Sequence, residues 1–134
     1  MKRASPLPAP IRWYFILAVI GLAAGSLSNL FLPLPGYPVA PTSIAIAVVL
    51  GSLLIIGVVR FHSNLARWIF ALWVAAAITL TVAGVIFSPG LARLFGWGNI
   101  LAIVVTSSAN VAAVLCVFSS EGAHWFGSRQ ATTD

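Results

Sequence analysis

The sequence predicts an all-α fold, an integral membrane bundle of four helices. Of the 134 residues, 60% are hydrophobic and only 7% are charged, whereas about a quarter of the residues of a soluble domain are charged. A soluble globule of this size cannot bury so much apolar surface, so lipid must surround most of the chain. The apolar runs are continuous rather than alternating, which favours helices over strands. Each run is about 18–20 residues long, enough for a helix to cross the hydrocarbon layer.

Breaks in the apolar pattern divide the chain into a short leading segment, a membrane domain and a tail. Proline-rich sequence ends the first apolar run, because proline lacks an amide donor and clashes with the preceding turn. A short polar stretch ends the second run, and Ser88-Pro89-Gly90 ends the third. The expected parts are a leading segment at 1–12, a membrane domain at 13–118 with spans at 13–32, 42–59, 68–87 and 99–118, and a tail at 119–134.

The basic residues predict the orientation of the spans. Arg93 alone falls on one side of the membrane, and the other six Lys and Arg residues fall on the opposite side. Loops rich in Lys and Arg stay in the cytoplasm, so we expect a multi-pass protein of the bacterial inner membrane with both termini cytoplasmic. The net charge of +5 does not indicate a nucleic-acid partner, because the basic residues are scattered along the chain. The six are Lys2, Arg3, Arg12, Arg60, Arg67 and Arg129.

The distribution of ionisable residues argues against an enzyme and against a proton-coupled pump. No Asp, Glu, Lys or Arg lies within any predicted span, and the only carboxylates, Glu121 and Asp134, are in the tail. Ionisable groups inside a membrane usually mark proton or ion pathways, and general acid–base catalysis needs positioned carboxylates or histidines. The layout is similar to that of small multidrug resistance transporters, but the glutamate that those proteins carry in the first span is missing. We expect no catalytic residues.

The possible metal ligands are too few to predict a metal site. His62 and His124 fall on the same side of the membrane, and Cys116 is the only cysteine. A closed metal site wants more ligands than two histidines, and one cysteine permits no CxxC motif or internal disulfide. We therefore expect neither a metal nor another cofactor.

Small residues recur at helical spacing in three spans and are the candidates for helix packing. Membrane helices associate through close backbone approach and interhelical hydrogen bonds, which small and hydroxyl residues permit. Asn110 lies beside the third stripe, and its amide should reach another helix or water, because it cannot be satisfied within its own helix as easily as Ser or Thr. The candidates are Gly21 and Gly25 in the first span, Ala71, Ala75 and Thr79 in the third, and Ala102, Thr106, Ala109, Asn110 and Ala113 in the fourth.

The run Thr106-Ser107-Ser108-Ala109-Asn110 makes the fourth span the most polar. Two interpretations fit it. The residues could hold helices together, or they could form the polar wall of a path for a solute. We place the helix contact first, since small and polar residues are common at membrane helix interfaces.

The chain also resembles short bacterial four-span membrane proteins of unknown function. The likeness rests on Asn64-Leu65-Ala66-Arg67-Trp68 at the start of the third span and on Trp125-Phe126 after the fourth. It implies a bacterial inner membrane but no activity. The leading hypothesis is a non-enzymatic scaffold or accessory subunit that acts through helix contacts, with the lipid bilayer and either further copies of itself or another membrane protein as partners. The alternative is a small oligomeric channel or carrier for an uncharged or weakly charged solute.

Overall fold

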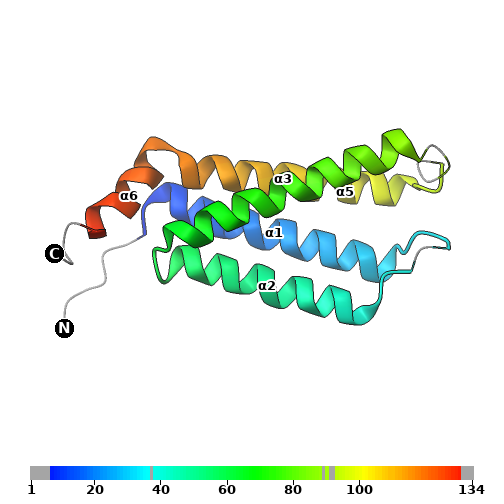
Figure 1. The fold of residues 1–134 in the computed structure, drawn as a ribbon, viewed down its shortest axis with the longest axis horizontal. Coiled ribbons are helices and arrows are strands. Elements are labelled where there is room, and N and C mark those ends of the chain that lie inside the picture. Colours follow the sequence, from blue (N-terminus) through cyan, green and yellow to red (C-terminus); the bar gives the residue numbers. More distant parts are fainter. Residues whose placement is uncertain (1–6, 37, 89, 91–92, 131–134) are drawn as a thin grey trace.

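The computed structural model of the chain describes residues 7–36, 38–88, 90 and 93–130. These residues form helices and no strand, which confirms the predicted all-α four-helix bundle. Four of the helices are long and apolar enough to cross a membrane (Figure 1). They are α1 (Ala9–Phe31), α2 (Pro41–Val59), α3 (Asn64–Phe87) and α5 (Trp97–Phe118), and a shorter helix, α6 (Ser120–Gln130), follows them.

Two of the long helices begin before the apolar spans that the sequence predicts, because their first turns carry favourable residues. Pro10 lies in the first turn of α1, where proline is tolerated because the missing amide would have no helical partner. Ser63 caps α3, since its Oγ accepts a hydrogen bond from the amide of Ala66 at 3.1 Å. At its N-terminus each of these two helices therefore extends about one turn beyond its apolar run.

Part of the predicted tail is helical. The hydroxyl of Ser119 donates to the carbonyl of Cys116 at 2.8 Å and accepts from the amide of Gly122 at 3.2 Å, so one side chain serves the end of α5 and the start of α6. Glu121 lies in the first turn of α6, where a carboxylate interacts favourably with the helix dipole. Phe126 on this helix is 7% exposed and belongs to the hydrophobic core.

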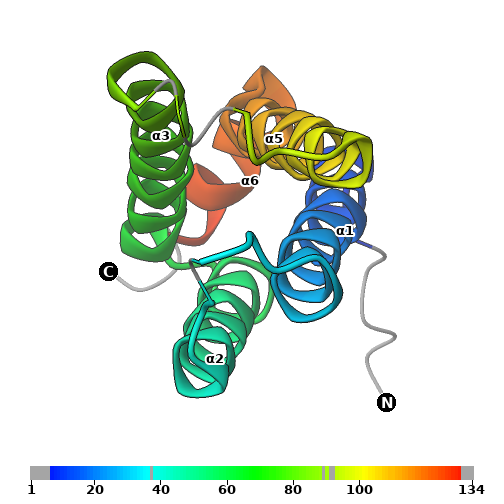
Figure 2. The same cartoon turned by 90° about the vertical axis from the view of Figure 1, so that its right-hand side faces the viewer.

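The four long helices form a ring in the order α1, α2, α3, α5 when the bundle is viewed along its length (Figure 2). Helices α1 and α5 make the most extensive contact, while α3 and α5 touch least among the neighbours in this ring. The start of α1 and all of α6 lie at one end of the bundle, which we call the terminal end. The opposite end, which holds residues 32–36, 38–40, 88, 90 and 93–96, is the loop end.

The buried residues of the bundle lie between its middle and the terminal end. No described residue of 22–50 or of 75–108 is buried, so the half toward the loop end has no close-packed core. The molecule thus consists of a packed terminal half and a loosely packed loop half. The buried residues of the long helices are Ile11, Tyr14, Ala18, Gly21, Gly51, Ile55, Val58, Ala66, Phe70, Val74, Ala109, Ala113 and Val117.

Candidate functional site

The loosely packed half contains a hollow between the helices. Two adjoining cavities of about 190 and 250 Å³ share part of their lining and together form what we call the central hollow. All four long helices line the first cavity, and α1, α3 and α5 line the second. The shared lining residues are Gly25, Asn29, Val74, Ala77, Thr106 and Asn110.

The contact between α1 and α5 brings together two of the predicted stripes. Gly21 faces Asn110, and a Cβ atom added at Gly21 would lie 2.8 Å from Cγ of Asn110. Gly25 faces Thr106, where an added Cβ would lie 3.4 Å from Cγ2, an ordinary contact. The Asn110 carboxamide can therefore lie against α1 because Gly21 has no side chain.

Polar side chains that line the hollow keep unused hydrogen-bonding groups among the described residues. Asn110 forms no side-chain hydrogen bond with any described residue. The hydroxyl of Thr106 is buried and also lacks a partner in the described part of the chain. Asn29 donates its amide to the carbonyl of Gly25 at 2.9 Å, which leaves its side-chain oxygen as an acceptor. Polar groups without hydrogen-bond partners cost free energy in hydrocarbon. Water or a polar ligand that hydrogen-bonds to these groups would therefore be stabilised in the hollow.

The hollow carries no ionisable group among its described lining residues. The other polar side chains around it are the hydroxyls of Ser26, Ser28, Thr81 and Ser107 and the indole of Trp73. The apolar part of the wall includes Val74 and Ala77 of α3. The site is therefore neutral, and it offers both hydrogen-bond donors and acceptors beside an apolar wall.

Aromatic and aliphatic side chains close the hollow toward the terminal end. Phe70 lines the hollow and packs edge-to-face against Tyr14, with ring centroids 5.3 Å apart and planes at 83°. Closer to the terminal end than this pair, Ile11, Val58 and Val117 are almost completely buried. These side chains form the layer that separates the hollow from the terminal end.

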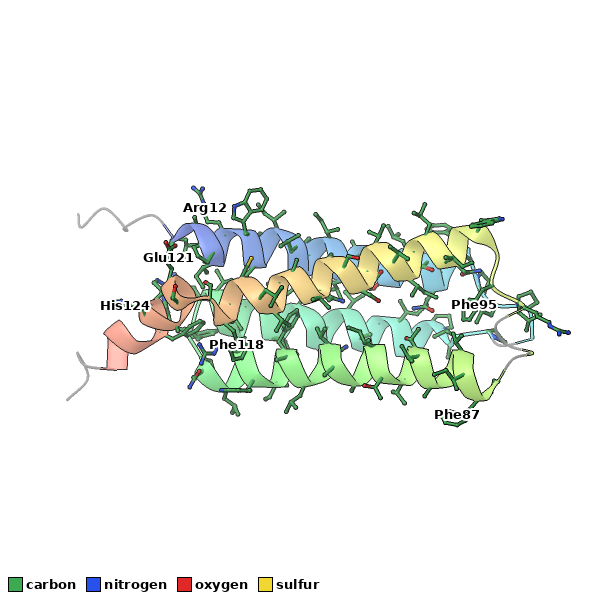
Figure 3. All side chains as sticks on the ribbon, turned by 90° about the horizontal axis from the view of Figure 1, so that it is seen from above. Arg12, Phe87, Phe95, Phe118, Glu121 and His124 are labelled. Carbon is green, nitrogen blue, oxygen red and sulfur yellow. The ribbon has the colours of Figure 1, made fainter. Side chains whose placement is uncertain are left out.

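Helix α6 adds a second closure at the terminal end. The guanidinium carbon of Arg67 lies 4.5 Å from the ring centroid of Phe118 and 4.8 Å from that of Phe126, so one cation connects α3, α5 and α6. The rings of His62 and Trp125 are 4.0 Å apart and connect α6 to the turn before α3. Figure 3 shows Phe118, Glu121 and His124 together at this end, and Phe87 and Phe95 at the other.

The structure distributes the remaining packing candidates between two environments. Ala109 and Ala113 are buried in the terminal half, and Ala102 is half-buried at the second cavity. On α3, Ala71 is half-buried, while Ala75 and Thr79 are exposed and are not brought against another helix of this chain. The inward face of α3 instead carries Phe70, Val74, Ala77, Ile78 and Thr81. A role for Ala75 and Thr79 in packing against another chain stays a prediction.

Sequence reasoning missed Asn29, Phe70, Ala77 and Thr81 as residues of the site. A signal for Asn29 was present, because it follows Gly21 and Gly25 at the same four-residue spacing and therefore lies on the same face of α1. No comparable signal existed for α3, whose inward face depends on how the helix is rotated in the bundle. The orientation of that face is a tertiary property.

The histidines, the cysteine and the glutamate do not form a cluster. No group of three or more His, Cys, Asp or Glu residues lies within reach of a common ion in the described part of the chain. His124 and Glu121 are exposed, and Cys116 is a half-buried free thiol.

None of the family models, the curated proteins or the solved structures compared with this chain matches it.

Proposed function

We propose that the protein binds a small uncharged or weakly charged polar solute in the central hollow and acts as a carrier or channel for it. The sequence alone placed a scaffold first and this function second. The observation that reverses the order is a neutral hollow in the membrane domain, in which the described part of the chain offers no hydrogen-bond partner to the Asn110 carboxamide or to the Thr106 hydroxyl.

The size of the hollow supports a small ligand. A water molecule needs roughly 10–15 Å³ of cavity space, and the two cavities measure about 190 and 250 Å³. There is room for several water molecules or for a solute of a few non-hydrogen atoms. The small side chains at Gly25, Ala77 and Ala102 leave this space open.

The chemistry of the lining favours a neutral solute. An ion would lose its hydration without meeting an opposite charge, and charges within a bilayer are costly. A neutral polar solute would exchange its water hydrogen bonds for those of Asn110, Thr106 and Asn29. Asn110 and Thr106 would in turn gain partners that no described residue gives them, and Asn29 would gain one for its side-chain oxygen.

The closed terminal end supports entry of the solute into the hollow from the opposite end of the bundle. In this conformation a solute would enter from the loop end, and the Tyr14–Phe70 layer and α6 would form the barrier. The charge pattern of the sequence predicts that the loop end lies on the outer side of the membrane. A carrier would need these two closures to open in a second conformation.

Osmotic swelling of vesicles that contain the purified protein tests this function. Urea, acetamide and glycerol serve as solutes, and we expect at least one of them to enter faster than into protein-free vesicles. Ala77→Leu fills the hollow and should abolish the increase. Ala76→Leu adds the same side chain at an exposed neighbouring position outside the lining, so it should keep the increase. Entry of all three solutes at the protein-free rate would contradict the proposal.

A self-associating scaffold is the second candidate, and the outward face of α3 favours it. Ala75 and Thr79 expose a strip of small side chains of the kind that membrane helices use to approach each other closely. Ala75→Leu should then reduce the oligomer size measured in mild detergent, whereas Ala76→Leu should not. An identical size for the wild type and Ala75→Leu would argue against association through this face.

A further inference from the structure

We infer that Asn110 selects solutes that carry a hydrogen-bond donor and an acceptor side by side, and that Gly21 positions its carboxamide for this task. The inference rests on the proposed function and assigns a solute class to the same hollow. Urea and simple amides are members of this class.

Asn110 has the chemistry that such a selection requires. A carboxamide presents an oxygen that accepts and an NH2 group that donates, so it can pair with a solute amide through two hydrogen bonds at once. The side chain borders both cavities, and no described residue uses its hydrogen-bonding groups. A solute that offers only acceptors would leave the Asn110 oxygen unpaired.

Two neighbouring groups extend the same pattern. Thr106 lies one turn from Asn110 on α5, and its hydroxyl is buried without a partner. Asn29 contributes a free acceptor oxygen from α1, because its amide is held by the carbonyl of Gly25. With Val74 and Ala77 on the opposite wall, the site fits a small solute with one polar edge and one less polar side.

Gly21 fixes where the carboxamide lies. An alanine Cβ at this position would approach Cγ of Asn110 to 2.8 Å and would come still closer to Oδ1, so the side chain would have to turn away from α1. At Gly25 the corresponding Cβ would lie 3.4 Å from the Thr106 side chain and would displace nothing. The two glycines therefore form a matched pair, in which the same substitution displaces a polar group at one site only.

Urea and guanidinium are the probes for the experiment, because they have nearly the same planar shape and differ in charge. Their rates of entry into vesicles are measured with the wild type and with variants, and protein-free vesicles give the background. For the wild type we expect urea entry above the background and guanidinium entry at the background. Asn110→Leu should lower the urea rate about tenfold, which corresponds to about 1.4 kcal/mol. Val111→Leu, at an exposed position on the same helix, should leave it unchanged.

Two further variants test selection rather than blockage. Asn110→Asp introduces a carboxylate of nearly the same shape and should raise guanidinium entry while urea entry falls. Gly21→Ala should lower the urea rate more than Gly25→Ala does, although both add one methyl group. Variants count only if they elute as a single peak of wild-type size. If Asn110→Leu does not fold, Gly21→Ala decides the question.

The outcomes separate the inference from the function on which it rests. Wild-type vesicles that admit neither urea, acetamide nor glycerol above the background would overturn the proposed function. Wild-type entry of urea with unchanged rates in Asn110→Leu or in Gly21→Ala would overturn the role of these two residues alone. Equal acceleration of urea and guanidinium by the wild type would overturn the neutral solute class.

Discussion

Arg67 lies where three helices meet, and its contacts are not those of an ordinary anchor residue at a membrane interface. Its guanidinium group packs between the rings of Phe118 on α5 and Phe126 on α6. Its charge could be used from sequence to orient the spans, because only its position along the chain matters for that purpose. Its aromatic contacts could not be predicted, since they form only when α6 folds back over the end of the bundle.

Arg67→Lys should lower the stability of the protein although the charge is retained. A lysine ammonium group is tetrahedral and has no planar face to stack on the two rings, whereas a guanidinium is planar. Cation–π contacts contribute about 0.5–2 kcal/mol each. Thermal unfolding in detergent should therefore show a lower midpoint for this variant. Arg60→Lys, at an exposed position at the same end, is the control. Equal midpoints for the two variants would argue against a stabilising stack.

At the scale of elements, the long helices could be predicted and α6 could not. The hydropathy and the length of the apolar runs were sufficient to predict α1, α2, α3 and α5. In lipid a single segment can satisfy all of its backbone hydrogen bonds only as a helix. Residues 120–130 are polar on average and give no such signal. Their helix depends on the Ser119 cap and on the burial of Phe126, and the second of these is a tertiary contact.

Phe126→Ala should detach α6 from the bundle without unfolding the long helices. Replacing a buried phenylalanine by alanine costs about 3–5 kcal/mol in well-packed cores, and the Arg67 contact would be lost as well. Hydrogen exchange should show faster exchange of the α6 amides and unchanged protection in α1 and α5. Gly127→Ala, next to it on an open face, should preserve α6. Continued protection of α6 in Phe126→Ala would mean that other contacts hold the helix.

At the scale of the whole molecule, the two halves of the bundle differ in how they are packed. The stripe positions Gly21, Gly25, Thr106 and Asn110 could be chosen from sequence as candidates, and the structure brings them together between α1 and α5. The hollow beside them could not be predicted, because it depends on the crossing of the helices and on which face of α3 turns inward. The residue pattern within one helix determines neither the crossing of the helices nor the inward face of α3.

The most direct test of the account is a cysteine accessibility profile along α5. Cys116 is first replaced by alanine, and single cysteines are placed at Ala102, Thr106 and Asn110 in the hollow and at Ala113 and Val117 in the packed half. A small hydrophilic thiol reagent is then added to vesicles that contain each variant. We expect reaction at positions 102, 106 and 110, because they line a cavity large enough to admit water, and none at 113 and 117, because those side chains are buried. No reaction at 106 and 110, or equal reaction at all five positions, would contradict the account.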